Sequence, residues 1–125
     1  IPQPNQISLL SLHSGESPAC ISMQYLVRCS LRLRPDRIIV GEIRGAEILD
    51  FLSAAATGHE GCMTTLHAGS PQLALLRMKQ LYKLNHVPSM TDQDILDEIY
   101  HVVDLIIQVN RFPHGRFITD VMVLS

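Results

Sequence analysis

The apolar run Ile38-Ile39-Val40 constrains the fold more than any other stretch of the chain. It follows Pro35, which ends a preceding helix because its ring keeps the residue before it out of helical geometry, and it stops at Gly41. A short, unbroken run of β-branched residues is typical of a strand that is buried on both faces of a parallel sheet. Such a strand needs helices on its two sides, so the run predicts an α/β fold.

The rest of the chain contains the other elements of such a fold. Apolar spacing and the residues that start and stop helices predict helices over residues 22–33, 46–57, 71–85 and 91–103. Strands are expected at 7–12 and, buried, at 62–67, with a polar loop at 13–18, and a hairpin at 105–111 and 116–124. We therefore expect one domain with a mostly parallel sheet, flanking helices and a carboxy-terminal hairpin.

Several helix ends are marked by single residues. Gly58 is a natural stop after the second helix, and Ser70 followed by Pro71 starts the third. Thr91 with Asp94 three residues later resembles a capping box at the start of the fourth.

Composition narrows the class of protein. With 125 residues, 46% of them apolar, the chain has enough material for one core, and its net charge of −2 gives no general attraction to nucleic acid. Charge is unevenly placed: residues 28–44 hold five arginines, and residues 91–104 hold five acids without a Lys or Arg. The arginine-rich region is expected to bind anions, and the acidic region to be a solvated face of the protein.

Cysteine usage and hydropathy favour a reducing, cytosolic protein. The three cysteines are an odd number with no close pair, unlike a disulfide framework or a zinc site. No apolar run reaches the roughly 18–20 residues that cross a bilayer, and no leader segment opens the chain. Because the chain begins at Ile1-Pro2 without Met, we expect it to be part of a longer protein.

Gly41 and Glu42 form the first candidate site. They follow the apolar run, at the carboxyl edge of the predicted sheet where α/β folds bind ligands. Gly41 allows close approach to the backbone, and the arginines around Glu42 suit phosphate, which the planar guanidinium grips well. A strand end with surface salt bridges explains the same residues equally well.

Two histidines bracket the second predicted buried strand. His59 lies at its entry and His67 at its exit, so in a parallel sheet His67 should emerge at the same edge as Glu42. Thr64, Thr65 and Ser70 add hydroxyl donors for a phosphate. For each histidine alone, an ordinary surface position is the simpler interpretation. A zinc site is disfavoured, because the eight-residue spacing across a strand does not match the helical His-Glu-x-x-His pattern.

Together, these stretches resemble a known family. Residues 31–47, LRLRPDRIIVGEIRGAE, resemble the Walker B region of secretion and pilus ATPases, and residues 58–69, GHEGCMTTLHAG, resemble their histidine box. The chain is most similar to the hexameric ATPases of bacterial type IV secretion systems, over essentially its whole length.

This resemblance implies that residues 1–125 are the carboxy-terminal part of a RecA-like P-loop NTPase domain that hydrolyses ATP with Mg²⁺. It implies a homo-hexamer at the cytoplasmic face of the inner membrane, with secretion-machinery partners, peripheral membrane contact and no specific nucleic acid. Glu42 matches the Walker B glutamate, holding Mg²⁺ through water, and His67 matches the histidine that approaches the terminal phosphate. The remaining phosphate-proximal candidates are Arg32, Arg34, Gly41, Arg44, His59 and Thr65.

Two departures from the general P-loop pattern stand out. Gly41 occupies the first of the two acidic positions of the usual Walker B motif, as it does across this family. No Gly-x-x-x-x-Gly-Lys-Ser/Thr occurs in the 125 residues, so we expect the phosphate loop and an amino-terminal domain upstream.

Other functions stay open at this point. A type II secretion or type IV pilus motor shares the same motifs. A non-catalytic ring-assembly piece and a nucleic-acid-binding module using Arg28–Arg44 are further alternatives, although scarce aromatics argue against the last.

Overall fold

The computed structural model describes residues 3–12 and 21–124. Along the chain, the elements are α1 (Met23–Leu31), β1 (Ile39–Val40), α2 (Glu47–Ala56), β2 (Met63–Thr64), α3 (Pro71–Tyr82), the 3₁₀ turn η1 (Lys83–Asn85), α4 (Asp92–Val102), β3 (Leu105–Phe112) and β4 (Gly115–Val123). All four predicted helices and the predicted hairpin are therefore present. Within the described ranges, no helix is long and apolar enough to cross a membrane.

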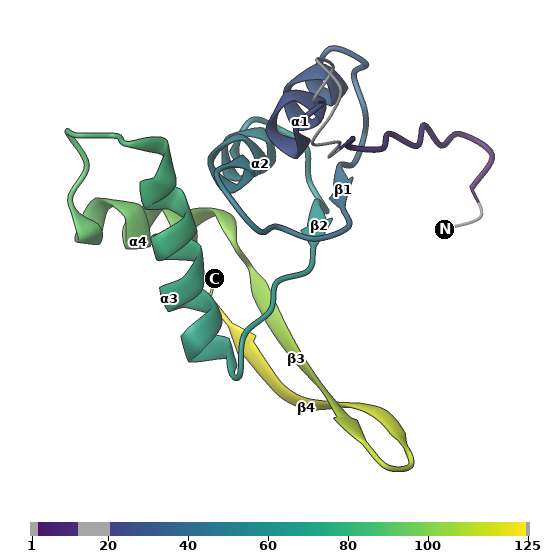
Figure 1. Cartoon of the computed structure of the whole chain (residues 1–125), viewed down its shortest axis with the longest axis vertical. Coiled ribbons are helices and arrows are strands. Elements are labelled where there is room, and N and C mark those ends of the chain that lie inside the picture. The colour runs from purple at the N-terminus through teal and green to yellow at the C-terminus, as the bar shows by residue number, and fades with distance from the viewer. Residues whose placement is uncertain (1–2, 13–20, 125) are drawn as a thin grey trace.

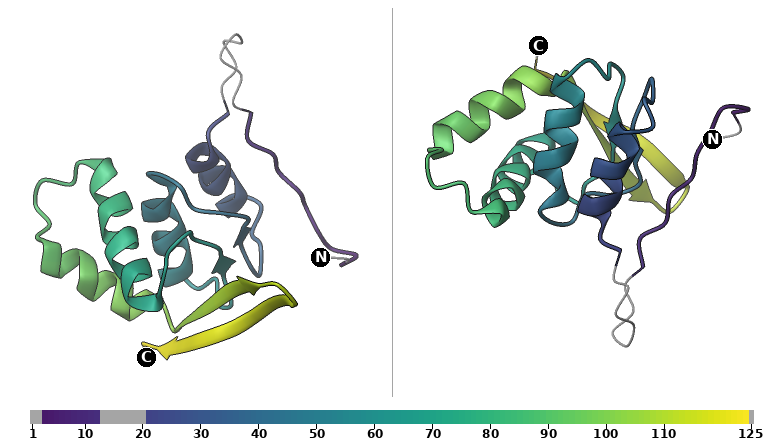
Figure 2. Two further views of the ribbon diagram at one scale, coloured as in Figure 1. Left: turned by 60° about the horizontal axis from the view of Figure 1, so that its bottom comes forward. Right: turned by 90° about the horizontal axis from the view of Figure 1, so that it is seen from above.

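The helices pack in chain order around α2. α1 contacts α2, α2 contacts α3 and α4, and the β3–β4 hairpin lies against α3 (Figure 1, Figure 2). Ile48 and Leu52 of α2 are each 1% exposed and lie at the centre of the core. Burying each such side chain contributes roughly 1.5–3 kcal/mol.

The helix caps follow the sequence signals. The Ser22 hydroxyl accepts from the Tyr25 amide, and the Ser70 hydroxyl accepts from the Leu73 amide ahead of Pro71. The predicted capping box of α4 is complete. α2 ends at Thr57, and Gly58 then takes a φ of 93°, which a residue with a Cβ rarely adopts.

The sheet is split into two pairs. β1 pairs in parallel with β2, and β3 pairs antiparallel with β4 with an irregularity between Gln108 and Val109. The two parallel strands are two residues long each.

Three expectations about the strands are wrong within the described chain. Residues 7–12 form no strand, because only Leu12 makes a bridge, to Ile21, and a strand needs a continuous neighbour. Ile39 is 49% exposed, since no described segment covers that face of β1, so the run is buried on one face. β2 is also exposed on both residues, because its only strand neighbour is β1.

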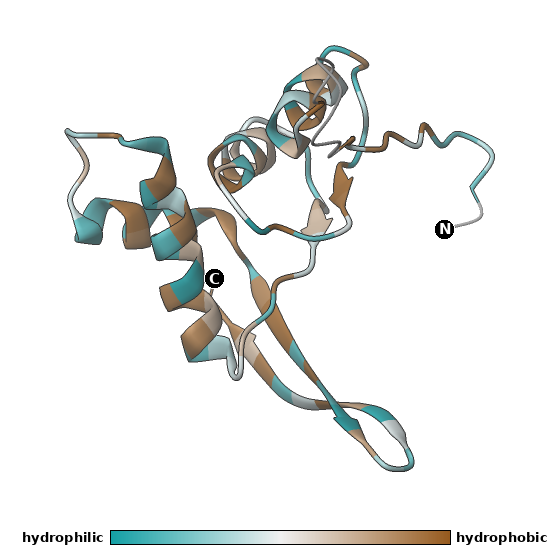
Figure 3. Ribbon diagram, viewed as in Figure 1, coloured by the Kyte–Doolittle hydropathy of each residue, from teal (hydrophilic) through white to brown (hydrophobic). Residues whose placement is uncertain are grey.

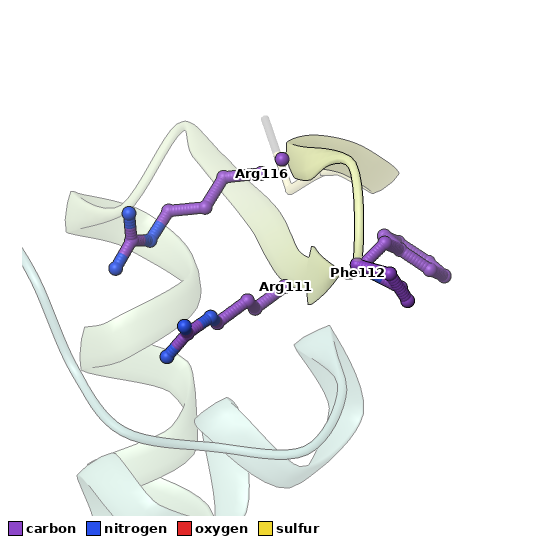
Figure 4. A pocket seen from close by; sticks show the side chains of 5 residues that line it. Arg111, Phe112 and Arg116 are labelled. Atoms are coloured by element: carbon purple, nitrogen blue, oxygen red, sulfur yellow. The ribbon is translucent and has the colours of Figure 1, made fainter.

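Apolar surface remains open on both sheets (Figure 3). Met63 lies beside Ile39 in register and is 52% exposed, and residues of the hairpin such as Ile107 and Val121 are about half exposed. At the hairpin tip a hollow of about 470 Å³ is lined by Arg111, Phe112, Pro113, Gly115 and Arg116 (Figure 4).

The acids of segment 91–104 are mostly exposed, as the sequence predicts, and two of them also have partners in α3 and η1. Asp92 pairs with Lys79 at 3.1 Å and with Lys83, both from the α3–η1 segment, and Glu98 accepts from the Tyr82 hydroxyl at 2.7 Å. These partners come from an earlier part of the chain, which the local charge pattern could not reveal. The predicted loop 13–18 and Cys20 lie outside the described residues.

Candidate active site

The parallel pairing of β1 and β2 brings Glu42 and His67 together. Ile39 is in register with Met63 and Val40 with Thr64, so both strands end at the same edge. The loops that follow carry Glu42 and His67, whose Oε1 and Nε2 atoms are 3.0 Å apart. The predicted meeting of these two side chains is therefore present in the structure.

A cation holds the Glu42 carboxylate in its ionised form. Nη2 of Arg44 lies 2.5 Å from Oε2 of Glu42. The hydrogen bond from Arg44 lowers the pKa of Glu42, against a smaller opposing effect of burial, and the charges of Arg44 and His67 lower it further. At neutral pH Glu42 therefore carries a negative charge at the sheet edge.

The two partners of Glu42 are both largely exposed, the Arg44 side chain at 78% and the His67 side chain at 91%. The guanidinium of Arg44 is always protonated, and pairing with Glu42 raises its pKa further. Glu42 is the one polar partner of the His67 side chain among the described residues. His67 can therefore turn towards a bound ligand at little cost in packing.

Thr65 fixes the backbone beside Glu42. Its hydroxyl donates to the Gly41 carbonyl at 2.6 Å, and its carbonyl accepts from the Ile43 amide at 3.0 Å. Thr65 was expected near a phosphate. In the structure, its side chain joins the two loops of the sheet edge.

Glu47 is a residue that the sequence reasoning did not select. It is the only buried charged residue of the described chain, at 9% exposure. Its Oε1 accepts from the Arg44 amide at 2.6 Å and from the Gly45 amide at 3.0 Å. The sequence contains one signal that could have identified Glu47: it is an acid in the first turn of a helix, directly after a glycine-containing loop.

His59 lies at the opposite end of β2. Its Nδ1 is 3.0 Å from the Ala54 carbonyl of α2, and its own carbonyl accepts from Sγ of Cys62 at 2.9 Å. Gly61 adds a second positive φ of 75° to this turn. The structure therefore does not bring His59 to Glu42 and His67.

Of the basic candidates, Arg44 alone contacts Glu42. Arg32 caps the carboxyl end of α1, and Arg34 follows with a positive φ of 51°. Both side chains are exposed and have no ion pair within the described part of the chain. Arg28, which was grouped with them, pairs with Asp50 of α2 at 2.7 Å.

The side chains at the sheet edge can be compared with the ligands that magnesium prefers. Residues 3–12 and 21–124 contain no group of three or more His, Cys, Asp or Glu side chains placed to hold a metal ion. One ionised carboxylate at the sheet edge suits Mg²⁺, which prefers oxygen ligands and keeps several of its waters. Glu42 is the residue that fits this role.

Comparison with known proteins places the chain in a family. The family model described as "Type II/IV secretion system protein" matches residues 1–112. The chain belongs to this family. Together with the relatives and the solved structure described next, this match confirms the α/β, RecA-like fold class and the resemblance to type IV secretion ATPases.

Individual relatives agree with this family. The chain is 38% identical over 102 residues to the probable conjugal transfer protein TrbB of Sinorhizobium fredii, covering 82% of this chain and 30% of the relative. It is 35% identical over 124 residues to the type IV secretion system protein VirB11 of Brucella suis, covering 94% of this chain and 34% of the relative. The chain thus spans about a third of these curated relatives.

A solved structure shows the same arrangement. The VirB11 ATPase from the Brucella suis type IV secretion system, in complex with sulphate, superposes with a TM-score of 0.77 at 34% identity. The match covers 82% of this chain and 32% of that one. This supports the order of helices and strands described above.

Proposed function

We propose that the protein to which this chain belongs hydrolyses ATP as a hexameric ring and powers export or pilus assembly in a type IV secretion system. The observation that carries the proposal is the ionised Glu42 at the end of β1, with His67 at 3.0 Å from the end of β2. Phosphoryl transfer needs a carboxylate near the metal ion and a hydrogen-bond donor near the terminal phosphate. The sheet edge of this chain offers one of each.

The side chains divide the work in the following way. Glu42 would hold magnesium through its waters and orient the attacking water. His67 would donate from Nε2, the atom that now contacts Glu42, to an oxygen of the terminal phosphate. Magnesium, when bound, neutralises charge on the phosphates. Arg44 keeps Glu42 ionised throughout.

The type IV assignment is supported by the relatives. Conjugal transfer and VirB11 proteins match most of the chain, whereas the family description covers both type II and type IV systems. The proposal includes a cytoplasmic position at the inner membrane with peripheral membrane contact and secretion-machinery partners. A non-catalytic ring-assembly module would have no need for the paired Glu42 and His67.

The test is Glu42→Gln in the full-length protein. The change is nearly isosteric and removes the charge, so we expect nucleotide binding to persist and most turnover to be lost. Asp97→Asn is the matched control, because Asp97 lies on α4, away from the site, and its carboxylate accepts from the side chain of Gln93. Steady-state ATPase rates and nucleotide titrations measure both effects. Wild-type turnover in Glu42→Gln would show that Glu42 is structural.

A further inference from the structure

Two clamps hold the loop that carries Glu42. On one side, Thr65 binds Gly41 and Ile43 through its hydroxyl and carbonyl. On the other side, the buried carboxylate of Glu47 binds the amides of Arg44 and Gly45. Glu42 therefore lies between the two residues that Thr65 holds, and Arg44, its cationic partner, is held by Glu47.

The buried carboxylate of Glu47 makes strong hydrogen bonds that hold the loop in place. A buried carboxylate is costly unless its lone pairs are satisfied, and no buried polar side-chain atom in the described residues lacks a partner. Hydrogen bonds to a charged acceptor are roughly twice as strong as neutral ones. The Arg44 amide bond of 2.6 Å fixes the residue whose side chain reaches back to Glu42.

Gly45 completes this arrangement by leaving room for the carboxylate. A Cβ at position 45 would lie 3.0 Å from Oε2 of Glu47. That distance is closer than ordinary contact, so a Cβ at this position would make the Glu47 carboxylate shift by a few tenths of an ångström. The backbone of Gly45 does not have a positive φ, so space is what the glycine provides.

We infer that Glu47 is a positioning residue for the ATPase site: it sets the orientation of the Arg44–Glu42 pair through the backbone of residues 44 and 45. This inference rests on the proposed function of Glu42. Glu47 reaches no ligand itself and acts through the loop. A misplacement of about 1 Å at a reacting group can cost on the order of a hundredfold in rate, which is why such a residue matters.

The experiment compares variants of the full-length protein. Glu47→Ala removes both acceptor bonds, so we expect kcat to fall at least about tenfold while KM for ATP stays within about twofold. Glu47→Gln keeps an oxygen that can accept both bonds and should recover kcat to within about fivefold of wild type. Gly45→Ala should lower kcat in the same direction by a smaller factor, because it shifts the same carboxylate without removing it.

Asp50→Ala is the matched control. Asp50 lies one turn further along α2, accepts from Gln24 and pairs with Arg28, both at 2.7 Å, and has no contact with the loop. Its loss should lower the melting temperature and leave kcat unchanged. Amide hydrogen exchange of residues 43–46 gives a readout that needs no ATP turnover, and it should accelerate in Glu47→Ala but not in Asp50→Ala.

The outcomes separate the two proposals. If Glu42→Gln keeps full turnover, the proposed function fails. If Glu42→Gln is inactive while Glu47→Ala keeps wild-type kcat and wild-type exchange at residues 43–46, the clamp alone is wrong. A loss of kcat in Glu47→Ala that Glu47→Gln does not recover, or that only accompanies unfolding, also overturns it.

Discussion

At the scale of single residues, His67 is set apart by its exposure. Most residues that hold the sheet edge are fixed by hydrogen bonds to backbone, as Thr65 and Glu47 are. His67 touches Glu42 with a side chain that is 91% exposed. An exposed donor beside a charged carboxylate contributes little to stability, so its role is expected in ligand contact.

His67→Ala tests that role in the full-length, assembled protein. Removing one donor that acts on developing charge typically lowers turnover by about 10²–10³-fold, and we expect roughly two orders of magnitude here. The melting temperature should be nearly unchanged because the side chain is exposed. Steady-state ATPase rates, thermal melting and the mass of the assembled ring are the measurements.

His59→Ala is the informative control for His67. His59 is half-buried against α2, so its loss should lower the melting temperature more than it lowers turnover. If His67→Ala keeps full turnover, or if its turnover falls only as the ring dissociates, His67 does not act on the phosphate.

At the scale of helices and strands, α3 and α4 are joined by a charge cluster. Asp92 at the start of α4 pairs with Lys79 of α3 and with Lys83 of η1, so one carboxylate links two cations of the preceding segment. Hydrogen bonds from Lys83 and Lys79 lower the pKa of Asp92 below the ordinary aspartate value of 3.8. The negative charge also lies at the N-terminus of α4, where it is favoured by the helix dipole.

The lowered pKa predicts how the stabilisation depends on pH. A carboxyl group with a depressed folded-state pKa stabilises the fold fully above its unfolded pKa, near 3.8, and loses this as pH falls through the lower folded value. Asp92→Asn should therefore melt below wild type at pH 7, and the difference should shrink as pH falls below about 4. Melting curves across that range measure it, and a pH-independent difference would show that charge is not the cause.

Local signals predicted the helices well, because helix ends are determined by nearby residues. Ser70, Pro71 and the Thr91–Asp94 box mark true helix starts. Strand burial was predicted less well, since it depends on what covers each face. Ile39 has the residue type of a core strand, and it is half exposed because no described segment covers it.

Within the site, too, some contacts could be predicted from the sequence and others could not. Glu42 and His67 could be placed together because parallel strands end at one edge, a rule that needs only the strand order. The Glu47 clamp and the Arg28–Asp50 pair could not, because they depend on how α2 sits against a loop and against α1.

At the scale of the whole molecule, the chain exposes more surface than a compact domain. Its accessible area is 9025 Å², whereas a compact monomer of 14.0 kDa exposes about 6,700 Å². Ile39 and Met63 beside the site, and the half-exposed residues of the hairpin, are part of this excess. Exposed apolar surface of this kind is typical of faces that contact further protein, and the proposed ring would cover it.

The last prediction concerns these 125 residues taken alone. The sequence contains no Gly-x-x-x-x-Gly-Lys-Ser/Thr, and the described site presents an ionised Glu42 whose nearest cation, Arg44, is already paired with it. A triphosphate would meet a negative charge without the backbone amides and Lys that hold its β and γ phosphates in P-loop enzymes. We therefore expect calorimetry on the folded, monodisperse segment with Mg²⁺ to find no ATP affinity tighter than about millimolar, and no turnover, while the full-length protein binds. Circular dichroism confirms that the segment is folded. Micromolar affinity would mean that the Glu42–His67 edge itself grips the phosphates, and Arg32 and Arg34 would then be the first residues to replace.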